Sequence, residues 1–229
     1  MLKELLSVFR QGDDGLAEAN SGFLDMLRIC EEMFTQAHAG IWDQPLDAGA
    51  RSEMYRKDRR VNKTERHVRR LVLTWMNTGG AAGRLTHCVV LLHVVKDAER
   101  VGDYAKNLSE IREYHLEPLP NDDVSAELRE IGGHIREILA GTIRCMDAQD
   151  EEDAVNLVVE ARDLGKRCDK LLLRIANSQH SPATVTALVL VCRFYKRTSA
   201  HLANILSSLV MPVHKIDYFD EREIESAGS

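Results

Sequence analysis

The chain has 229 residues, of which 44% are hydrophobic and 5% aromatic, and its formal net charge is −6. This length allows one large domain or two small ones with a sizeable core, which Leu, Val, Ile, Ala and Met must fill. So few aromatic side chains suit helix-on-helix packing, and the negative charge argues against a general nucleic-acid-binding protein.

The N-terminal sequence Met-Leu-Lys-Glu-Leu-Leu carries charge too early for a signal peptide and has no long apolar core. The longest unbroken apolar runs, 89–92 and 187–192, are far shorter than the ~20 residues that a membrane span needs. The five cysteines are scattered without a Cys-x-x-Cys pair, which predicts buried, reduced thiols. These features together predict a soluble, cytoplasmic protein.

Helix-breaking residues divide the chain into six segments. The prolines all lie at such breaks: Pro45, Pro118, Pro120, Pro182 and Pro212. Ser181 is a typical N-cap residue followed by proline at the first helical position, and the glycine-rich stretch 77–83 makes a further break. Between the breaks, apolar residues recur at spacings of three and four, which places them on one helix face. The pattern predicts helices over residues 13–39, 47–76, 81–115, 122–147, 151–177 and 182–211, and no strand.

The third and sixth predicted helices resemble each other at an offset of 97 residues. The matching pairs include Leu91 and Leu188, Val94 and Val191, Arg100 and Arg197, and Asn107 and Asn204. Because the helix order repeats as well, the similarity indicates an internal duplication. We expect an all-α fold of two tandem three-helix bundles. The first repeat would span residues 1–117, and the second, with an acidic C-terminal tail, residues 118–229.

The sharpest local signal is the segment 96–107 of the third predicted helix. Glu99 and Asp103 are four residues apart, so their carboxylates lie on one helix face. Like charges at this spacing destabilise a helix by roughly 0.2–0.5 kcal/mol, and a bound hard cation would offset that cost. However, Lys96, Arg100 and Lys106 are near enough along the helix to form ion pairs with these acids. The spacing alone therefore favours an ion-pair surface and leaves a metal site as the alternative.

This segment resembles the signature of the PhoU family of phosphate-signalling regulators, which usually reads Asp-Leu-Glu-Arg-Ile-Gly-Asp-His-Ala-x-Asn. The matching residues are Asp97, Glu99, Arg100, Gly102, Asp103, Ala105 and Asn107. The upstream stretch from Asp58 to Glu65 is similar to the family's pattern on the second helix. The helix count and the duplication also agree, so the resemblance extends over nearly the whole chain.

The resemblance implies two tandem three-helix bundles, and several family members bind multinuclear iron or zinc clusters through a (Glu/Asp)-x-x-x-Asp motif in each repeat. Here the first motif would supply Glu99 and Asp103, with Asp58 and Glu65 as candidates for further ligands. In the second repeat, Lys196 and Ala200 stand at the ligand positions. An ammonium group and a methyl group cannot bind a cation, so we expect no metal there, and Lys196 should reach a carboxylate or solvent.

The family resemblance further implies a non-enzymatic regulator of phosphate uptake and signalling. Its expected partners are a phosphate transporter and the cytoplasmic region of a sensor histidine kinase, with peripheral membrane association through these partners and no nucleic acid. A homo-oligomer, such as a homodimer, is also implied. Two alternatives remain: an iron- or zinc-binding carboxylate protein with a hydrolytic or storage role, and a structural helical interaction domain without metal.

Three further features have competing interpretations. Basic residues follow one face of the second predicted helix: Arg56, Arg60, Lys63, Arg66 and Arg70, with Lys57, Arg59 and Arg69 nearby. They could dock an acidic protein or lipid surface, or be balanced by acids of another helix or of the tail 217–225. His93 and Asp97 have the spacing of a helical ligand pair, but the apolar run around His93 favours a core histidine. The stretch 79–83 is predicted to be a turn rather than a phosphate-binding loop, since no strand precedes it.

Overall fold

The computed structural model describes residues 14–77 and 84–217. Within these two stretches the chain forms six long helices and one short 3-10 turn, without a strand, so the predicted all-α class is confirmed. The elements are α2 (Asp14–Trp42), α3 (Ala48–Asn77), α4 (Leu85–Tyr114), α5 (Asp123–Ala148), α6 (Glu151–Ala176), α7 (Pro182–Val210) and η2 (Val213–Lys215).

The helix ends follow the capping residues of the sequence. Asp122 accepts a hydrogen bond from the backbone N–H of Ser125 at 2.8 Å, and Asp150 caps α6 in the same way. Ser181 caps α7 ahead of Pro182, as predicted. The predicted helix bounds agree to within three residues, except that α4 begins at Leu85 instead of residue 81. The predicted turn over 79–83 and the tail beyond residue 217 lie outside the described residues.

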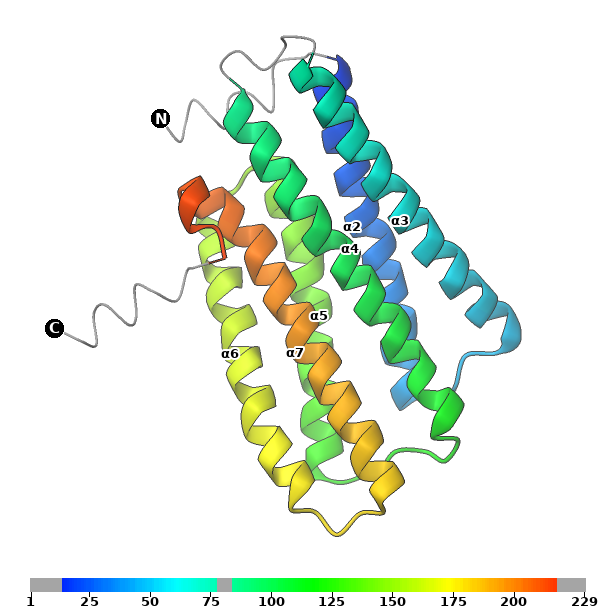
Figure 1. The fold of residues 1–229 in the computed structure, drawn as a ribbon. Helices are drawn as coiled ribbons and strands as arrows, with labels where there is room; N and C mark the ends of the chain where they lie inside the picture. The colour runs from blue at the N-terminus through cyan, green and yellow to red at the C-terminus, as the bar shows by residue number, and fades with distance from the viewer. Residues whose placement is uncertain (1–13, 78–83, 218–229) are drawn as a thin grey trace, which may run out of the picture.

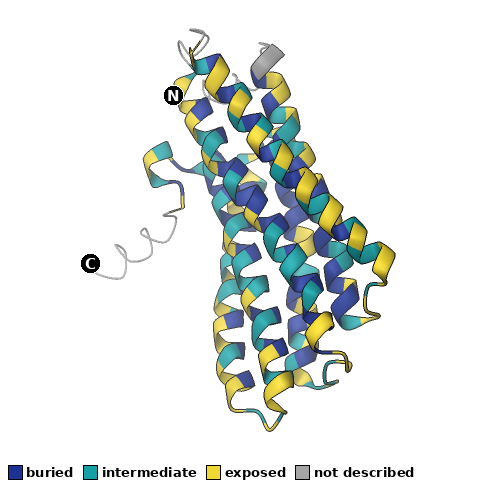
Figure 2. Cartoon of the chain, turned by 45° about the vertical axis from the view of Figure 1, so that its right-hand side comes forward, coloured by how far each residue is buried: buried dark blue, intermediate teal, exposed yellow. Residues whose placement is uncertain are grey.

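The six helices pack as two groups of three that lie side by side (Figure 1). Helices α2, α3 and α4 contact one another, as do α5, α6 and α7, while α4 packs on α7 and α2 on α5. Buried positions face inward along every helix, and one continuous apolar core fills the space between them (Figure 2). The helix order therefore repeats, while the division into two domains between residues 117 and 118 stays a prediction.

Helices α2, α5 and α7 meet at a polar contact inside the core. The Trp42 Nε1–H donates to the Tyr195 hydroxyl at 2.9 Å, and this hydroxyl lies 2.7 Å from His38 Nδ1. Since an indole N–H can only donate, the tyrosine O–H is free to donate to His38 Nδ1. Burial, together with the charge of Arg136, lowers the pKa of His38 to about 4. The histidine is therefore a neutral acceptor in this contact at pH 7.

The five cysteines are all buried and none forms a disulfide, so this prediction is confirmed. Among the helices of the described stretches, none is long and apolar enough to cross a bilayer.

Candidate functional site

Four carboxylates of the family-like motifs lie along the contact between α3 and α4. Asp58 and Glu65 come from α3, and Glu99 and Asp103 come from α4. Their side chains are only 10–23% exposed. Gly102 allows the close approach that buries them: a Cβ there would lie 3.3 Å from Cys30 Sγ and 3.4 Å from a methyl carbon of Val61. The glycine of the signature thus has a packing role between α2, α3 and α4.

Basic side chains occupy the spaces at one end of this row. Lys96 Nζ lies 2.7 Å from Glu99 and 3.9 Å from Glu65. Arg69 Nε pairs with Glu65 at 3.1 Å, and Arg100 Nε lies 3.7 Å from Glu99. Each glutamate therefore contacts two cations.

The other end of the row is organised around Lys106. Its ammonium group lies 3.2 Å from Asp58 and 3.2 Å from Asp103, and Arg100 also reaches Asp103 at 3.2 Å. Burial of Lys106 lowers its pKa, but the attraction and hydrogen bonds of Asp58 and Asp103 outweigh burial, so the pKa is raised overall. Lys106 is thus a fixed positive charge at the place between the two aspartates.

The four carboxylates have the right donor chemistry for iron or zinc but not the right arrangement in this structure. Three ligand atoms of a common ion must lie within a few ångströms of one another. In the stretches 14–77 and 84–217, the one group of three or more His, Cys, Asp or Glu donors within 4.8 Å is His93, Asp97 and Asp217. Ammonium and guanidinium groups lie between the motif carboxylates instead. The arrangement matches the ion-pair alternative, and a metal at Glu99 and Asp103 stays a prediction.

The corresponding face of the second repeat carries no such carboxylates on α7. Lys196 Nζ contacts both oxygens of Asp169 on α6, at 2.5 and 2.6 Å. The expectation that Lys196 reaches a carboxylate is therefore confirmed. Ala200 lines a small cavity of about 100 Å³ together with Arg162, Asn204 and Asp217.

A second polar group, which the sequence did not predict as a unit, joins α4 to α7. Asp97 Oδ1 lies 2.6 Å from His201 Nδ1 and accepts a hydrogen bond from Asn204 at 3.4 Å. The expectation of a core position for His93 is wrong, because its side chain is 44% exposed. His93 lies instead at the solvent-exposed edge of the contact between α4 and α7, beside Asp97 and Asp217. Asp97 was recognisable from the signature and Asn204 from the repeat, but no local sequence pattern could show that the two side chains meet.

The basic residues of α3 are only partly balanced by acids. Arg56 pairs with Glu53, Lys57 with Glu32, and Arg69 with Glu65. Five others are exposed and form no ion pair with any residue of the described stretches: Arg59, Arg60, Lys63, Arg66 and Arg70. We call these five residues the α3 basic face. Acids of the described helices therefore balance only part of this basic surface, and residues 218–225 of the acidic tail, the other expected source of acids, lie outside the described residues.

Comparisons with known proteins agree with the resemblance noted from the motifs. A family model described as the PhoU domain matches residues 23–111. A curated relative from Synechocystis, a phosphate-specific transport system accessory protein PhoU homolog, is 22% identical over 84% of this chain and 87% of its own length.

Two solved structures share the fold. One is the phosphate transport system regulatory protein PhoU from Streptococcus pneumoniae, with a TM-score of 0.73 and 18% identity over 85% of this chain and 93% of that one. The other is PhoU from Pseudomonas aeruginosa, with a TM-score of 0.73 and 20% identity over 87% of this chain and 97% of that one.

Proposed function

Because the PhoU-domain model matches residues 23–111 and the chain shares the fold of PhoU structures over most of its length, we propose that it is a cytoplasmic, non-enzymatic regulator of phosphate transport. It acts by binding proteins: a phosphate transporter, a sensor histidine kinase, or both. The observation that carries the proposal is the coincidence of the domain match with the signature segment on α4. This overlap favours a regulator over the two alternatives, a metal-storage protein and a purely structural helical domain.

A binding experiment with purified proteins tests this function directly. The chain should be captured by the cytoplasmic part of the transporter or of the kinase encoded in the same organism, and deletion of its gene should raise expression of phosphate-starvation genes in phosphate-rich medium. Capture by neither protein, together with unchanged expression, would contradict the proposal.

We further propose that the α3 basic face is the surface that contacts an acidic patch of the protein partner. Five cations without an ion-pair partner in the stretches 14–77 and 84–217 follow about 16 Å of helix, although the whole chain is negative. A concentrated positive field on an acidic protein selects a partner of opposite charge and accelerates its encounter. The face lies on the outer side of the bundle, where α3 is exposed (Figure 2).

Charge reversal on this face is expected to abolish most of the binding. Lys63→Glu together with Arg66→Glu should weaken the complex at least about tenfold at low ionic strength, because attraction becomes repulsion at two adjacent positions. Isothermal titration calorimetry at two salt concentrations measures the effect, which added salt should reduce.

A matched control exists on the second repeat. Lys170 and Arg193 are exposed on α6 and α7, and Lys170→Glu with Arg193→Glu changes the net charge of the chain equally. This control should bind almost normally. Equal weakening by both double variants would assign the effect to net charge and contradict a defined docking face. Selective binding of the wild type to anionic vesicles without protein would contradict an acidic protein as the partner.

The metal prediction for the first repeat has a separate test. If iron or zinc binds at Glu99 and Asp103, Glu99→Gln with Asp103→Asn should abolish the bound metal and leave the helicity unchanged, because amide oxygens are much weaker ligands than carboxylates. Elemental analysis and circular dichroism of the two proteins check this. Unchanged metal content in the double variant would place the metal elsewhere in the chain.

A further inference from the structure

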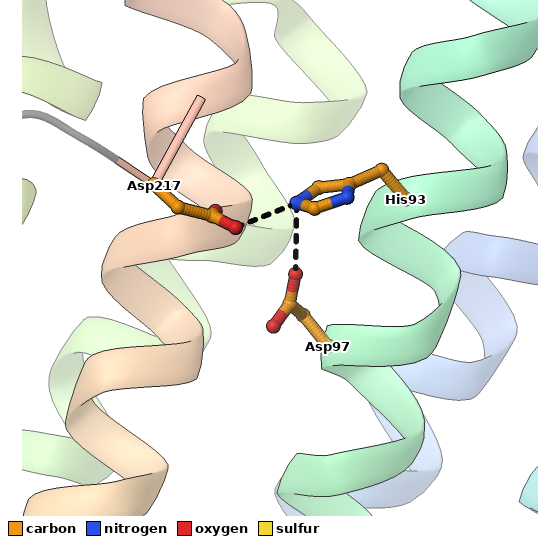
Figure 3. A group of neighbouring side chains, drawn as sticks. All are labelled: His93, Asp97 and Asp217. Carbon is orange, nitrogen blue, oxygen red and sulfur yellow. Dashed lines mark hydrogen bonds and ion pairs between the residues drawn. The ribbon is translucent and has the colours of Figure 1, made fainter. Parts of the chain in front are cut away.

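The group formed by His93, Asp97 and Asp217 brings together donors from the middle of α4 and from the segment after η2 (Figure 3). His93 Nε2 lies 2.8 Å from Asp217 Oδ2 and 3.8 Å from Asp97 Oδ2. Both carboxylates thus point at the same ring nitrogen, Asp97 from one turn further along α4 and Asp217 from the segment after η2.

The two carboxylates of this group are not neutralised in the way that the motif carboxylates are. In the described stretches, no lysine or arginine lies within ion-pair distance of Asp97 or Asp217, whose charged contacts are with His93 and His201 alone. One Nε2–H can serve only one of two carboxylate oxygens well. A divalent cation would satisfy both acids and the imidazole at once, which a proton cannot.

The donors are also held in position. His201 and Asn204 of α7 hold Oδ1 of Asp97, which leaves Oδ2 directed at His93. Asp217 has a left-handed backbone conformation, with φ of 76°, and its N–H donates to Ser207 Oγ at 3.3 Å. Partners of this kind behind a ligand fix its orientation and raise metal affinity.

The distances suit a first-row transition metal. With bonds of 2.0–2.2 Å, the ligand atoms of a tetrahedral zinc site lie about 3.4 Å apart, and the observed separations of 2.8 and 3.8 Å bracket this value. An imidazole nitrogen among the donors favours zinc over magnesium or calcium, which prefer oxygen alone. Three protein ligands leave a fourth position for water.

We propose that His93, Asp97 and Asp217 form a binding site for one Zn²⁺ ion, which ties the segment after α7 to α4. This site shares no ligand with the Glu99 and Asp103 pair and does not depend on the proposed regulatory function. A bound ion stabilises the folded chain by mass action, so zinc should raise the melting temperature.

Calorimetric titration of the full chain with ZnCl₂ tests the site, using chelator-treated protein purified without a polyhistidine tag. We expect one equivalent to bind, and His93→Ala and Asp217→Asn each to weaken binding at least about tenfold. Because both side chains are partly exposed, these variants should fold normally, which circular dichroism checks. His214→Ala, which removes an exposed histidine three residues from Asp217, should bind zinc like the wild type.

The double variant Glu99→Gln and Asp103→Asn distinguishes this site from the metal site predicted at Glu99 and Asp103. It should still bind one equivalent of zinc. Absence of zinc binding in the wild type would overturn the proposal, as would wild-type affinity in His93→Ala. Loss of the equivalent in the Glu99 and Asp103 variant alone would also overturn it, because the ion would then belong to α3 and α4.

Discussion

Replacing Gly132 by alanine is expected to lower the free energy of unfolding by about 3 kcal/mol, although alanine is the better helix former. Gly132 lies on α5 where it packs against α2 and α7. A Cβ there would lie 2.3 Å from His38 Nδ1 and 2.7 Å from the Tyr195 ring. Both rings are buried and joined by the hydrogen bond to the tyrosine hydroxyl, so neither can move without breaking that bond. Chemical denaturation of the variant measures the loss.

The neighbouring glycine provides the control. Nothing lies within 4 Å of a Cβ built on Gly133, which is in the same helix. Gly133→Ala should therefore raise the free energy of unfolding by up to about 1 kcal/mol, the difference in helix propensity. Equal stability of the two variants would contradict the close packing of α5 on His38 and Tyr195.

Most of the helical fold could be predicted because its determinants are local. Pro182 and Ser181 set the start of α7, and Asp122 and Asp150 cap the two helices before it. The repeat at an offset of 97 residues indicated which helices correspond. By contrast, Gly132 gave no signal, because its role depends on His38 and Tyr195, which are 157 residues apart in sequence.

The candidate sites divide in the same way. The spacing of Glu99 and Asp103 predicted that they share one helix face. The basic residues nearby in the sequence predicted the ion pairs that these acids form. The spacing of His93 and Asp97 indicated a possible ligand pair, but Asp217 could not be predicted as its third member, since it is 124 residues from His93 and meets it only through the packing of α4 on α7. The apolar neighbours of His93 were misleading for the same reason: helical periodicity does not show which face lies at the edge of a helix contact.

Acidification from pH 7 to pH 5 is expected to lower the free energy of unfolding by about 4 kcal/mol through two buried histidines. Burial, together with nearby Arg136, lowers the pKa of His38 to about 4. Burial, together with nearby Arg84, lowers the pKa of His87 to about 4 as well. In the unfolded chain both titrate near 6.5. The unfolded state therefore binds protons first as the pH falls, and each histidine costs about 2 kcal/mol of stability at pH 5.

The two neutral histidines contribute fully to the free energy of unfolding above pH 6.5. Their contribution falls between pH 6.5 and pH 4, and below pH 4 these groups cause no further loss. Urea denaturation at several pH values between 7 and 5 measures the slope, in a range where most carboxylates stay ionised. His38→Gln keeps an acceptor for the Tyr195 hydroxyl but cannot titrate, and His87→Gln likewise removes the second proton site. The double variant should be nearly independent of pH in this range. A wild-type slope in that variant would show that other groups cause the acid sensitivity, because neither substituted side chain can take up a proton.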